Sequence, residues 1–291
     1  MNILIDPILH RSIVEYYADA GVDYGTWSPS FNMHFGFGSV RKLFSREEML
    51  DRMSDEVLNR LELPASPARV ADLGCGVGAT MRRGAAAYRN AEFTGITIVP
   101  WQKSKGESLN EVQGLQDRVQ FVLSDYHQIP IASSSVDGVY AIESACYSPS
   151  ELQSRLIGEV QRVLKPGGRF VVADGFLKTT PAELNPCVLR MFRGICKNWS
   201  LPGMMNIDYV RNQLLLQGFT QINVEEISWR VAPSVLHVPF VIARFVLTKM
   251  WRREKLSRQS IRNLKGSFLA LMLGLHRKNF GYYIVSATNK F

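Results

Sequence analysis

The chain has 291 residues, of which 46% are hydrophobic, 10% aromatic and 21% charged, and its formal net charge is +8. These proportions are those of a folded protein and exclude extended disorder, and the length fits one large domain with additions rather than two equal domains. The positive charge is compatible with nucleic acid, a membrane surface or a phosphorylated small molecule, and it does not choose among them.

The cysteine spacing and the apolar segments of the sequence bear on the cellular compartment of the protein. The four cysteines are Cys75, Cys146, Cys187 and Cys196. They lack metal-ligand spacing and suggest no disulfide framework, so we expect no metal site and a reduced, cytoplasmic setting. The N-terminal sequence MNILIDPILHRSIVEYY lacks the basic start and apolar core of a signal peptide. No apolar run reaches the roughly 20 residues that cross a bilayer, because HVPFVIARFVL at 237–247 is too short and is interrupted by Arg244.

The predicted elements alternate between strands and helices through the middle of the chain. Strands are predicted over residues 69–73, 92–98, 119–123, 136–142, 169–174, 219–227 and 282–287. Helices are predicted over residues 78–88, 100–112, 149–164 and 207–217. Such alternation is typical of a doubly wound parallel sheet. We therefore expect an α/β fold with a Rossmann-like, mostly parallel, seven-stranded sheet.

Segments outside this alternation divide the chain. We predict an N-terminal helical and aromatic cap over residues 1–60, a core over 61–228, a basic helical lid over 229–280 and the last core strand over 281–291. The core includes an irregular insertion over residues 178–206. The aromatic segment, the insertion and the lid could converge over the carboxyl edge of the sheet, where open α/β folds bind ligands, or could only cap the core.

The sequence VADLGCGVGATM at residues 70–81 places an acid before a glycine-rich turn between a strand and a helix. Gly74, Gly76 and Ala79 fit a dinucleotide fingerprint loosely. However, the second strand ends in Thr97, where such cofactors need an acid. Asp72 would also repel a pyrophosphate at short range. A positively charged ligand removes this conflict, and S-adenosylmethionine (SAM) carries an ammonium and a sulfonium group and no phosphate.

This acid-x-Gly-x-Gly-x-Gly pattern resembles the first motif of the class I SAM-dependent methyltransferases, which release S-adenosylhomocysteine. The resemblance implies that Asp72, Gly74, Cys75 and Gly76 hold the methionine end of SAM.

Two further segments extend the resemblance. The sequence GITIVPWQ at 95–102 is similar to that of tocopherol methyltransferases and cyclopropane fatty-acid synthases. This similarity implies ribose and adenosyl contacts from Thr97, Ile98 and Gln102. The sequence LSDYHQIP at 123–130 resembles the adenine-site segment, which implies that Asp125 and Tyr126 lie there.

The sequence YAIESACYSPSELQSRLIGEVQRVLKPGGRF at 140–170 is similar to sterol C-methyltransferases, and the aromatic arm YGTWSPSFNMHFGFG at 24–38 is similar to sterol and tocopherol methyltransferases. By this resemblance Glu143 is the best candidate base beside the methyl site. The alternative is a carboxylate that holds SAM or an adjacent helix N-terminus. His34 and Tyr24 are further catalytic candidates. Tyr147 stands where the sterol enzymes have His, so the role of that His is not carried over.

Aromatic residues are expected to line an acceptor pocket, because methylation of an alkene carbon leaves a carbocation that aromatic faces stabilise. They are Tyr17, Trp27, Phe31, Tyr147 and Trp199. The resemblance implies SAM-dependent C-methylation of a lipophilic sterol, isoprenoid or terpenoid, with or without a diphosphate. Two alternatives stay open, namely O- or N-methylation of an aromatic or alkaloid natural product and a non-catalytic SAM- or lipid-binding module.

Lys and Arg residues are concentrated at 249–278, where Glu254 is the only acid in the sequence. This run predicts a solvated helix face, a peripheral contact with a membrane surface or binding of a diphosphate by Arg. A homo-oligomer is also left open. Nucleic-acid methylation fits the charge, but the Asn/Asp-Pro-Pro-aromatic motif typical of base methylation is absent from the sequence. We therefore expect no nucleic-acid partner.

Overall fold

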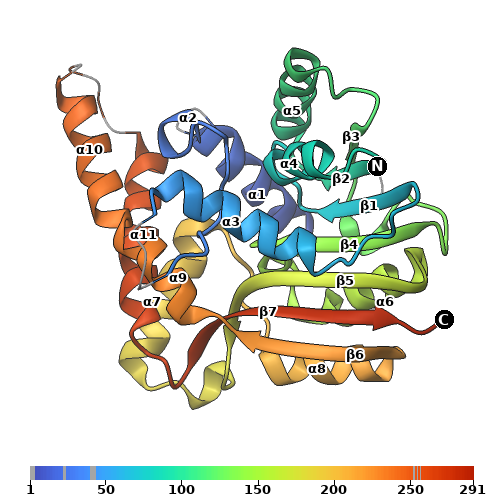
Figure 1. Ribbon diagram of the computed structural model, residues 1–291. Coiled ribbons are helices and arrows are strands. Elements are labelled where there is room, and N and C mark those ends of the chain that lie inside the picture. The colour runs from blue at the N-terminus through green and yellow to red at the C-terminus, as the bar shows by residue number, and fades with distance from the viewer. Residues whose placement is uncertain (1–3, 22–23, 40–43, 252, 254, 256) are drawn as a thin grey trace.

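The computed structural model describes residues 4–21, 24–39, 44–251, 253, 255 and 257–291, and it contains a seven-stranded sheet (Figure 1). The strands are β1 (Ala68–Leu73), β2 (Ala91–Thr97), β3 (Val119–Leu123), β4 (Val136–Ile142), β5 (Leu164–Leu177), β6 (Phe219–Glu226) and β7 (Phe280–Asn289). Their order is β3-β2-β1-β4-β5-β7-β6, and β7 is antiparallel to β5 and β6 whereas the other pairs are parallel. The predicted mostly parallel, doubly wound sheet is confirmed.

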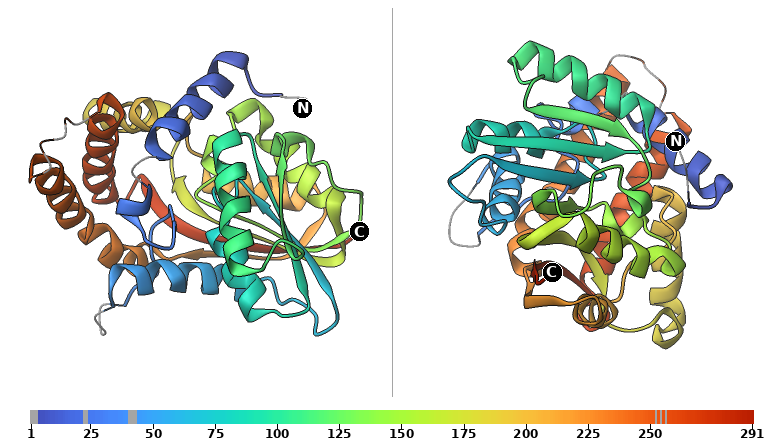
Figure 2. Two further views of the ribbon diagram at one scale, coloured as in Figure 1. Left: turned by 90° about the horizontal axis from the view of Figure 1, so that it is seen from above. Right: turned by 90° about the vertical axis from the view of Figure 1, so that its right-hand side faces the viewer.

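Helices cover both faces of this sheet (Figures 1 and 2). The helices that alternate with the strands are α4 (Ala79–Ala87), α5 (Pro100–Gln113), α6 (Gln153–Val163) and α8 (Ile207–Leu216). Leu156 of α6 and Leu214 of α8 belong to one buried cluster, and α4 belongs to a second cluster with α3 (Arg46–Asn59). Side chains along β5 alternate between the clusters: Phe170 and Val172 join the first and Val171 the second.

Residues 178–206 contain a 14-residue helix, α7 (Pro186–Trp199), where the sequence analysis expects irregular structure, and that expectation is wrong. Asn185 caps the helix because its side chain accepts a hydrogen bond from the Val188 N–H, and Pro186 occupies the first turn. Val188 and Ile195 lie at helical spacing and are buried in one cluster with residues of α11 (Arg258–Gly274). The Asn-Pro cap is the sequence signal that identifies this helix.

The remaining helices precede β1 or lie between β6 and β7. They are α1 (Pro7–Gly21), α2 (Tyr24–Trp27), α9 (Ser228–Leu236) and α10 (Val238–Trp251), together with α3 and α11. The aromatic arm between α2 and α3 is fastened to α9, because the Gly36 N–H donates to Ser234 Oγ at 2.8 Å and the Gly38 N–H donates to the Arg230 carbonyl at 2.7 Å. The N-terminal segment is thereby connected to α9, which belongs to the segment predicted as a lid.

The predicted lid, residues 229–280, contains a longer apolar helical stretch than the sequence analysis predicts. His237 alone separates α9 from α10, and Ser228–Trp251 forms a stretch of 24 residues that contains an 18-residue window with a mean hydropathy of 1.7. By length and composition this stretch could cross a membrane, so the prediction that no segment is long enough is wrong. The reason is that the apolar pattern of α10 continues upstream into α9. Only 17% of its apolar window is buried.

Candidate functional site

The loop after β1 brings bare backbone to the edge of a cavity. Gly74 and Gly76 have φ values of 74° and 54°, which residues with side chains rarely adopt. A side chain at Gly74 would also collide with Ser144, whereas the space beside Gly76 is open. The N–H groups of Gly74 and Cys75 donate to the Ile96 carbonyl at 2.9 and 3.1 Å, which fixes the loop on β2. The backbone at Gly76 therefore lines the cavity without a side chain in the way.

Asp72 places a carboxyl group in this cavity, where little water reaches it. The residue is 4% exposed, and burial raises the pKa of its carboxyl to about 7, against a smaller lowering by the nearby Tyr140 hydroxyl. Among the described residues that line the cavity there is no Lys or Arg. The charge of an ionised Asp72 is therefore left for a positively charged ligand to balance.

The ten residues predicted to hold the cofactor all line this one cavity. They are Asp72, Gly74, Cys75, Gly76, Thr97, Ile98, Gln102, Asp125, Tyr126 and Glu143. The uncompensated carboxyl and the bare glycine loop fit the cationic methionine end of SAM, and they do not fit a pyrophosphate. The contact that each residue makes with SAM stays a prediction.

Thr97 and Gln102 form a neutral pair where a dinucleotide-binding strand carries an acid. Thr97 Oγ1 donates to Gln102 Oε1 at 2.7 Å and accepts from the Val99 N–H at 3.1 Å. Both side chains are buried, and both line the cavity. Their mutual hydrogen bond fixes their orientation, so this part of the cavity is arranged before a ligand enters.

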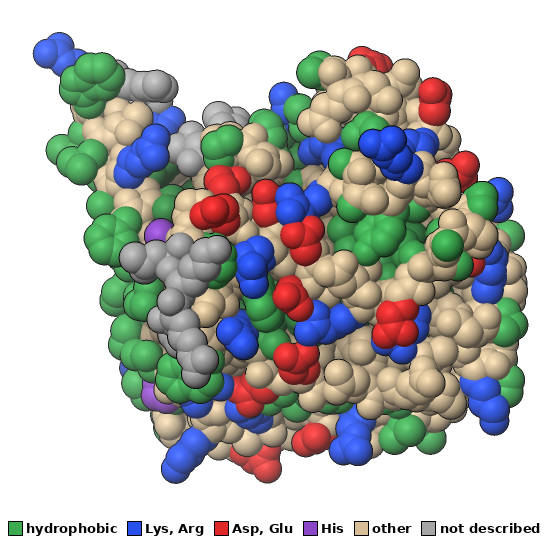
Figure 3. Space-filling view, in the orientation of Figure 1, with side chains coloured by type: hydrophobic (Ala, Val, Ile, Leu, Met, Phe, Trp, Pro, Cys, Tyr) green, Lys and Arg blue, Asp and Glu red, His purple; other side chains and the backbone are tan. Residues whose placement is uncertain are grey.

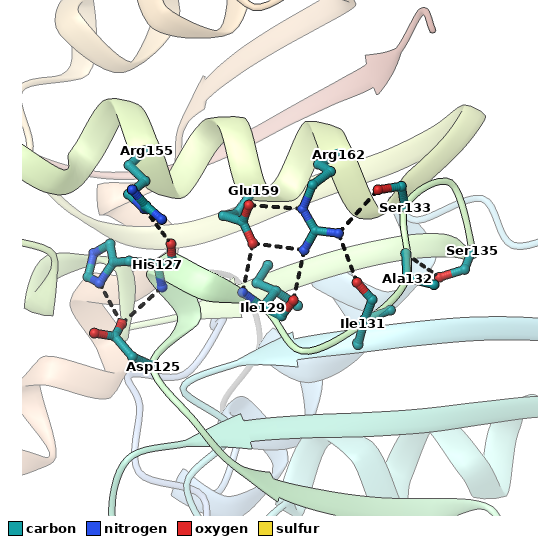
Figure 4. A network of polar contacts seen from close by, with 10 residues as sticks. All are labelled: Asp125, His127, Ile129, Ile131, Ala132, Ser133, Ser135, Arg155, Glu159 and Arg162. Atoms are coloured by element: carbon teal, nitrogen blue, oxygen red, sulfur yellow. Dashed lines mark hydrogen bonds and ion pairs between the residues drawn. The ribbon is translucent and has the colours of Figure 1, made fainter. Parts of the chain in front are cut away.

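Asp125 joins the core to the N-terminal segment. Its Oδ1 accepts from the backbone N–H and the ring Nδ1–H of His127 at 2.9 and 2.6 Å (Figure 4). Its Oδ2 accepts from the N–H groups of Leu4 and Ile5 at 2.9 and 3.3 Å. Burial acts to raise the pKa of Asp125, but the hydrogen bonds outweigh burial and lower the pKa to about 2. The N-terminal segment thus lies against the predicted adenine end of the cavity.

The 3-10 turn η1 (Tyr126–Gln128) and the loop after it are anchored to α6 (Figure 4). Arg155 Nε donates to the His127 carbonyl at 2.8 Å, and the Glu159 carboxylate accepts from the Ile129 N–H at 2.7 Å. Arg162 pairs with Glu159 at 2.8 Å and also donates to the Ile129 carbonyl at 2.7 Å. This network holds the segment that carries Asp125 in a fixed position.

A second cavity of about 220 Å³ adjoins the first, and aromatic side chains line much of it. The residues that line both cavities are Tyr17, Asn32, Met33, His34, Glu143 and Tyr147. The aromatic side chains of the second cavity are Tyr16, Tyr17, Trp27, Phe35, Tyr147, Trp199 and Tyr282. Four of the five predicted acceptor residues therefore lie there. The exception is Phe31, which lines the first cavity.

Glu143 follows β4 and lies where the two cavities meet. Its φ of 48° is unfavourable for a residue with a side chain, and its N–H donates to the Ala173 carbonyl at 2.9 Å. Its Oε1 accepts from the Phe35 N–H at 2.6 Å and from the Tyr282 hydroxyl at 2.8 Å. Burial raises the pKa of Glu143 to about 8, although both hydrogen bonds act to lower it. The carboxyl is thus held rigidly at a place where it can accept a proton.

Residues 70–168 match a family model described as a methyltransferase domain, and this range includes the glycine loop and Glu143. The domain over residues 70–168 is that of a class I SAM-dependent methyltransferase. The predicted family, and SAM as the cofactor of that family, are confirmed.

Relatives and a solved structure agree with this assignment. The chain is 35% identical over 158 residues to 24-methylenesterol C-methyltransferase 2 of Oryza sativa subsp. japonica, and the match covers 54% of this chain and 43% of that enzyme. It is 29% identical over 287 residues to the chloroplastic tocopherol O-methyltransferase of Arabidopsis thaliana, covering 93% and 79% of the two chains. Its fold matches the cyclopropane synthase MmaA2 from Mycobacterium tuberculosis with a TM-score of 0.79 and 17% identity, covering 99% and 100%. The chain spans less than half the length of the rice enzyme that it matches.

Of the other catalytic candidates, His34 has a ring that already makes hydrogen bonds. Its Nδ1–H donates to the Phe35 carbonyl at 2.9 Å, and its Nε2 lies 3.4 Å from Ser54 Oγ. Burial lowers the pKa of His34 to about 4, so the ring is neutral at pH 7. These contacts favour a structural role over acid–base chemistry. Tyr24 belongs to α2, but its side chain lies outside the described part of the structure.

The structure also brings two residues to the second cavity that the sequence analysis did not select. Tyr282 is paired with Gly175 across the antiparallel strands β7 and β5. Asp174 accepts hydrogen bonds from the N–H groups of Cys146 and Gly175 at 3.0 and 2.7 Å, and burial raises its pKa to about 6. An acid near the end of a core strand is a signal for Asp174. Tyr282 has no local signal, because its position depends on pairing between segments far apart in the sequence.

Proposed function

We propose that this methyltransferase transfers the methyl group of SAM to an alkene carbon of a lipophilic sterol, isoprenoid or terpenoid. The observation that carries the proposal is the position of Glu143, where the predicted SAM cavity meets a larger cavity lined by aromatic side chains. The 35% identity to a sterol C-methyltransferase supports carbon as the acceptor atom. A cytoplasmic location and a homo-oligomer stay proposals.

The residues on either side of Glu143 have separate tasks in this reaction. When bound, SAM supplies a methyl group that is already activated on a sulfonium. The first cavity would hold SAM with its cationic end toward Asp72, and correct alignment at about 3–3.5 Å can lower the barrier by roughly 7–11 kcal/mol. The faces of Tyr17, Tyr147 and Trp199 stabilise positive charge on the acceptor by about 0.5–2 kcal/mol for each contact. Glu143 then accepts the proton that the acceptor loses.

The charges around the larger cavity favour an acceptor that is uncharged before it reacts. The carboxyl groups of Glu143 and Asp174 line it, and among its described lining residues Arg46 is the only Lys or Arg. The Arg46 guanidinium already donates to the Trp27 carbonyl and lies 3.6 Å from Glu47. A diphosphate needs several such donors. We therefore place an uncharged isoprenoid ahead of a prenyl diphosphate.

The test is incubation of the purified protein with methyl-labelled SAM and four acceptor classes: sterol alkenes, prenyl alcohols, prenyl diphosphates and prenylated phenols. We expect label in a product with a new carbon–carbon bond, identified by NMR, and loss of that product in Glu143→Gln. Label that appears only on oxygen or nitrogen would contradict C-methylation. SAM binding without turnover of any acceptor would instead favour a non-catalytic SAM- or lipid-binding module.

The second candidate is O-methylation of a phenol on a lipophilic scaffold. The similarity to a tocopherol O-methyltransferase over 93% of the chain favours it. The Tyr282 hydroxyl and the Glu143 carboxyl, 2.8 Å apart, would then orient the phenol and take its proton. The acceptor panel separates the two candidates, because an O-methyl product keeps the acceptor alkene unchanged.

A further inference from the structure

The outer side of α10 carries an exposed apolar stripe. Phe240, Ala243, Leu247 and Met250 are all exposed and recur at helical spacing, and Trp251 follows at the end of the helix. Phe240 is 75% exposed, Leu247 63% and Trp251 85%. Figure 3 shows hydrophobic side chains over the projecting edge that α10 forms, with Lys or Arg at its tip. Exposed apolar surface of this extent marks an interaction site.

The segment that carries this stripe is strongly basic. Arg244 lies within the stripe, and the described residues from Val238 to Lys278 include no Asp or Glu, although the sequence also contains Glu254 there. The described Lys and Arg residues of this range are Arg244, Lys249, Arg253, Lys255, Arg258, Arg262, Lys265, Arg277 and Lys278. Of these, Arg277 is paired with Glu226 and Arg262 donates to the Lys197 carbonyl. Apolar side chains, a terminal Trp and surrounding cations are the features that bind a helix to anionic headgroups.

The same helices contribute to the larger cavity from their other side. Ser234 of α9, Val238 of α10, and Asn263 and Ser267 of α11 line that cavity. The stripe and the cavity are therefore two sides of one layer of helices. A surface that holds the outer side also places the cavity wall next to that surface.

Contacts with the folded domain fix α9 and α10 along its side. Val231 is buried in a core cluster, and Ser234 accepts a hydrogen bond from the Gly36 N–H at 2.8 Å. Phe245 is buried, and its ring stacks on Trp27 with centroids 6.0 Å apart. A membrane-spanning arrangement would break all of these contacts. The stretch can enter a headgroup region without breaking them, because only its outer side is exposed.

We propose that this protein docks on anionic lipid bilayers through the outer side of α10. Phe240, Leu247 and Trp251 enter the headgroup region, and Arg244 and the neighbouring cations face lipid phosphates and carboxylates. A second copy of the chain is a poorer occupant, because a symmetric dimer through this surface would place the same cations opposite one another. A bilayer supplies both the apolar depth and the negative charge that the surface needs.

Docking has a consequence for substrate supply, and this part alone rests on the proposed function. A lipophilic acceptor dissolves in the bilayer, and α10 would hold the larger cavity beside that reservoir. Loss of docking should therefore lower kcat/KM for an acceptor embedded in vesicles. It should leave kcat/KM unchanged for a short-chain acceptor that dissolves in water.

The test measures vesicle co-sedimentation of the full chain, with phosphatidylcholine vesicles that contain or lack phosphatidylserine. Wild-type protein should bind the anionic vesicles and dissociate as salt is added. Phe240→Ser combined with Leu247→Ser should weaken binding about tenfold per side chain, and Arg244→Gln about fivefold. Leu216→Ser on α8 is the matched control, since Leu216 is 77% exposed and lies outside this surface. Circular dichroism of each variant verifies that it is folded.

Fluorescence quenching by brominated lipids gives the depth of insertion. Shallow quenching that is lost in Trp251→Phe supports the proposal, whereas quenching at the bilayer centre contradicts surface docking. The proposal is overturned if the protein does not co-sediment with anionic vesicles, or if the Phe240/Leu247 double variant binds these vesicles as tightly as wild type does. A double variant that changes only the oligomeric state, measured by sedimentation, would assign the surface to a second copy. None of these readouts needs methyl transfer, so failure of docking and failure of the proposed activity are distinguishable.

Discussion

Replacement of Asp72 by Asn should stabilise the SAM-free protein while it weakens SAM binding. Burial raises the pKa of this carboxyl from 3.8 to about 7. At about 1.36 kcal/mol for each unit of pKa, the ionised form costs about 4 kcal/mol of folding stability above pH 7. The folded state binds more protons than the unfolded state between about pH 4 and pH 7, so stability falls as the pH rises through that range. Asn is uncharged at every pH, so the Asp72→Asn variant does not lose this folding stability as the pH rises.

Thermal unfolding at one pH near 5 and another near 9 measures the effect, because these values lie on either side of the pKa. We expect Asp72→Asn to melt several degrees above wild type near pH 9 and to differ from it by clearly less near pH 5, because most of the loss develops between those values. Calorimetry should show SAM binding at least about tenfold weaker, because a charged hydrogen bond is lost. Glu151→Gln, which removes an exposed carboxylate, should change neither quantity. Unchanged SAM affinity, or an equal melting difference at both pH values, would refute the reasoning.

Three further predictions concern the same cavities. Glu143→Gln should lower turnover by a factor of about 10²–10⁴ with little change in SAM affinity. The wild-type rate should rise with pH through the region of the Glu143 pKa of about 8, because the carboxyl accepts a proton only when it is ionised. If the rate of the Glu143→Gln variant rises with pH in the same way, Glu143 is excluded as the base. Gly76→Ala should cost about 1–2 kcal/mol of folding stability in denaturant titrations, because Gly76 has a positive φ. Gly74→Ala should cost clearly more, because the added Cβ would also collide with Ser144. Equal losses for the two variants would contradict this difference in packing. Asp125→Ala should release the N-terminal segment and speed tryptic cleavage after Arg11, seen by mass spectrometry; an unchanged cleavage rate would mean that the bonds to Leu4 and Ile5 do not hold this segment.

The first cavity could be predicted from sequence because its parts are local. Asp72, Thr97 and Asp125 follow from strands whose carboxyl ends meet at one edge of a parallel sheet, and the glycine pattern sets the turn beside them. The alternation of strand-like and helix-like segments along the chain also predicts the order of the strands and helices. These features depend on neighbours within a few residues, so one sequence is enough to find them.

The second cavity depends on contacts that periodicity does not encode. Glu143 is predictable as the residue after a strand, but its partners Phe35 and Tyr282 come from segments more than 100 residues away along the chain. The apolar residues of α10 give no sequence signal of exposure either. Their pattern fits a buried helix equally well, and only the packed structure shows that Phe240 and Leu247 are uncovered.

The attachment of the aromatic arm has a consequence for the orientation of Glu143. The Phe35 N–H holds Glu143, and the adjacent Gly36 N–H holds Ser234 of the lid. Because Phe35 and Gly36 are adjacent, a displacement of α9 that stretches the Gly36–Ser234 hydrogen bond would also act on the Phe35–Glu143 hydrogen bond. If Glu143 is the proton acceptor, as proposed, the orientation of its carboxyl would then depend on the position of α9.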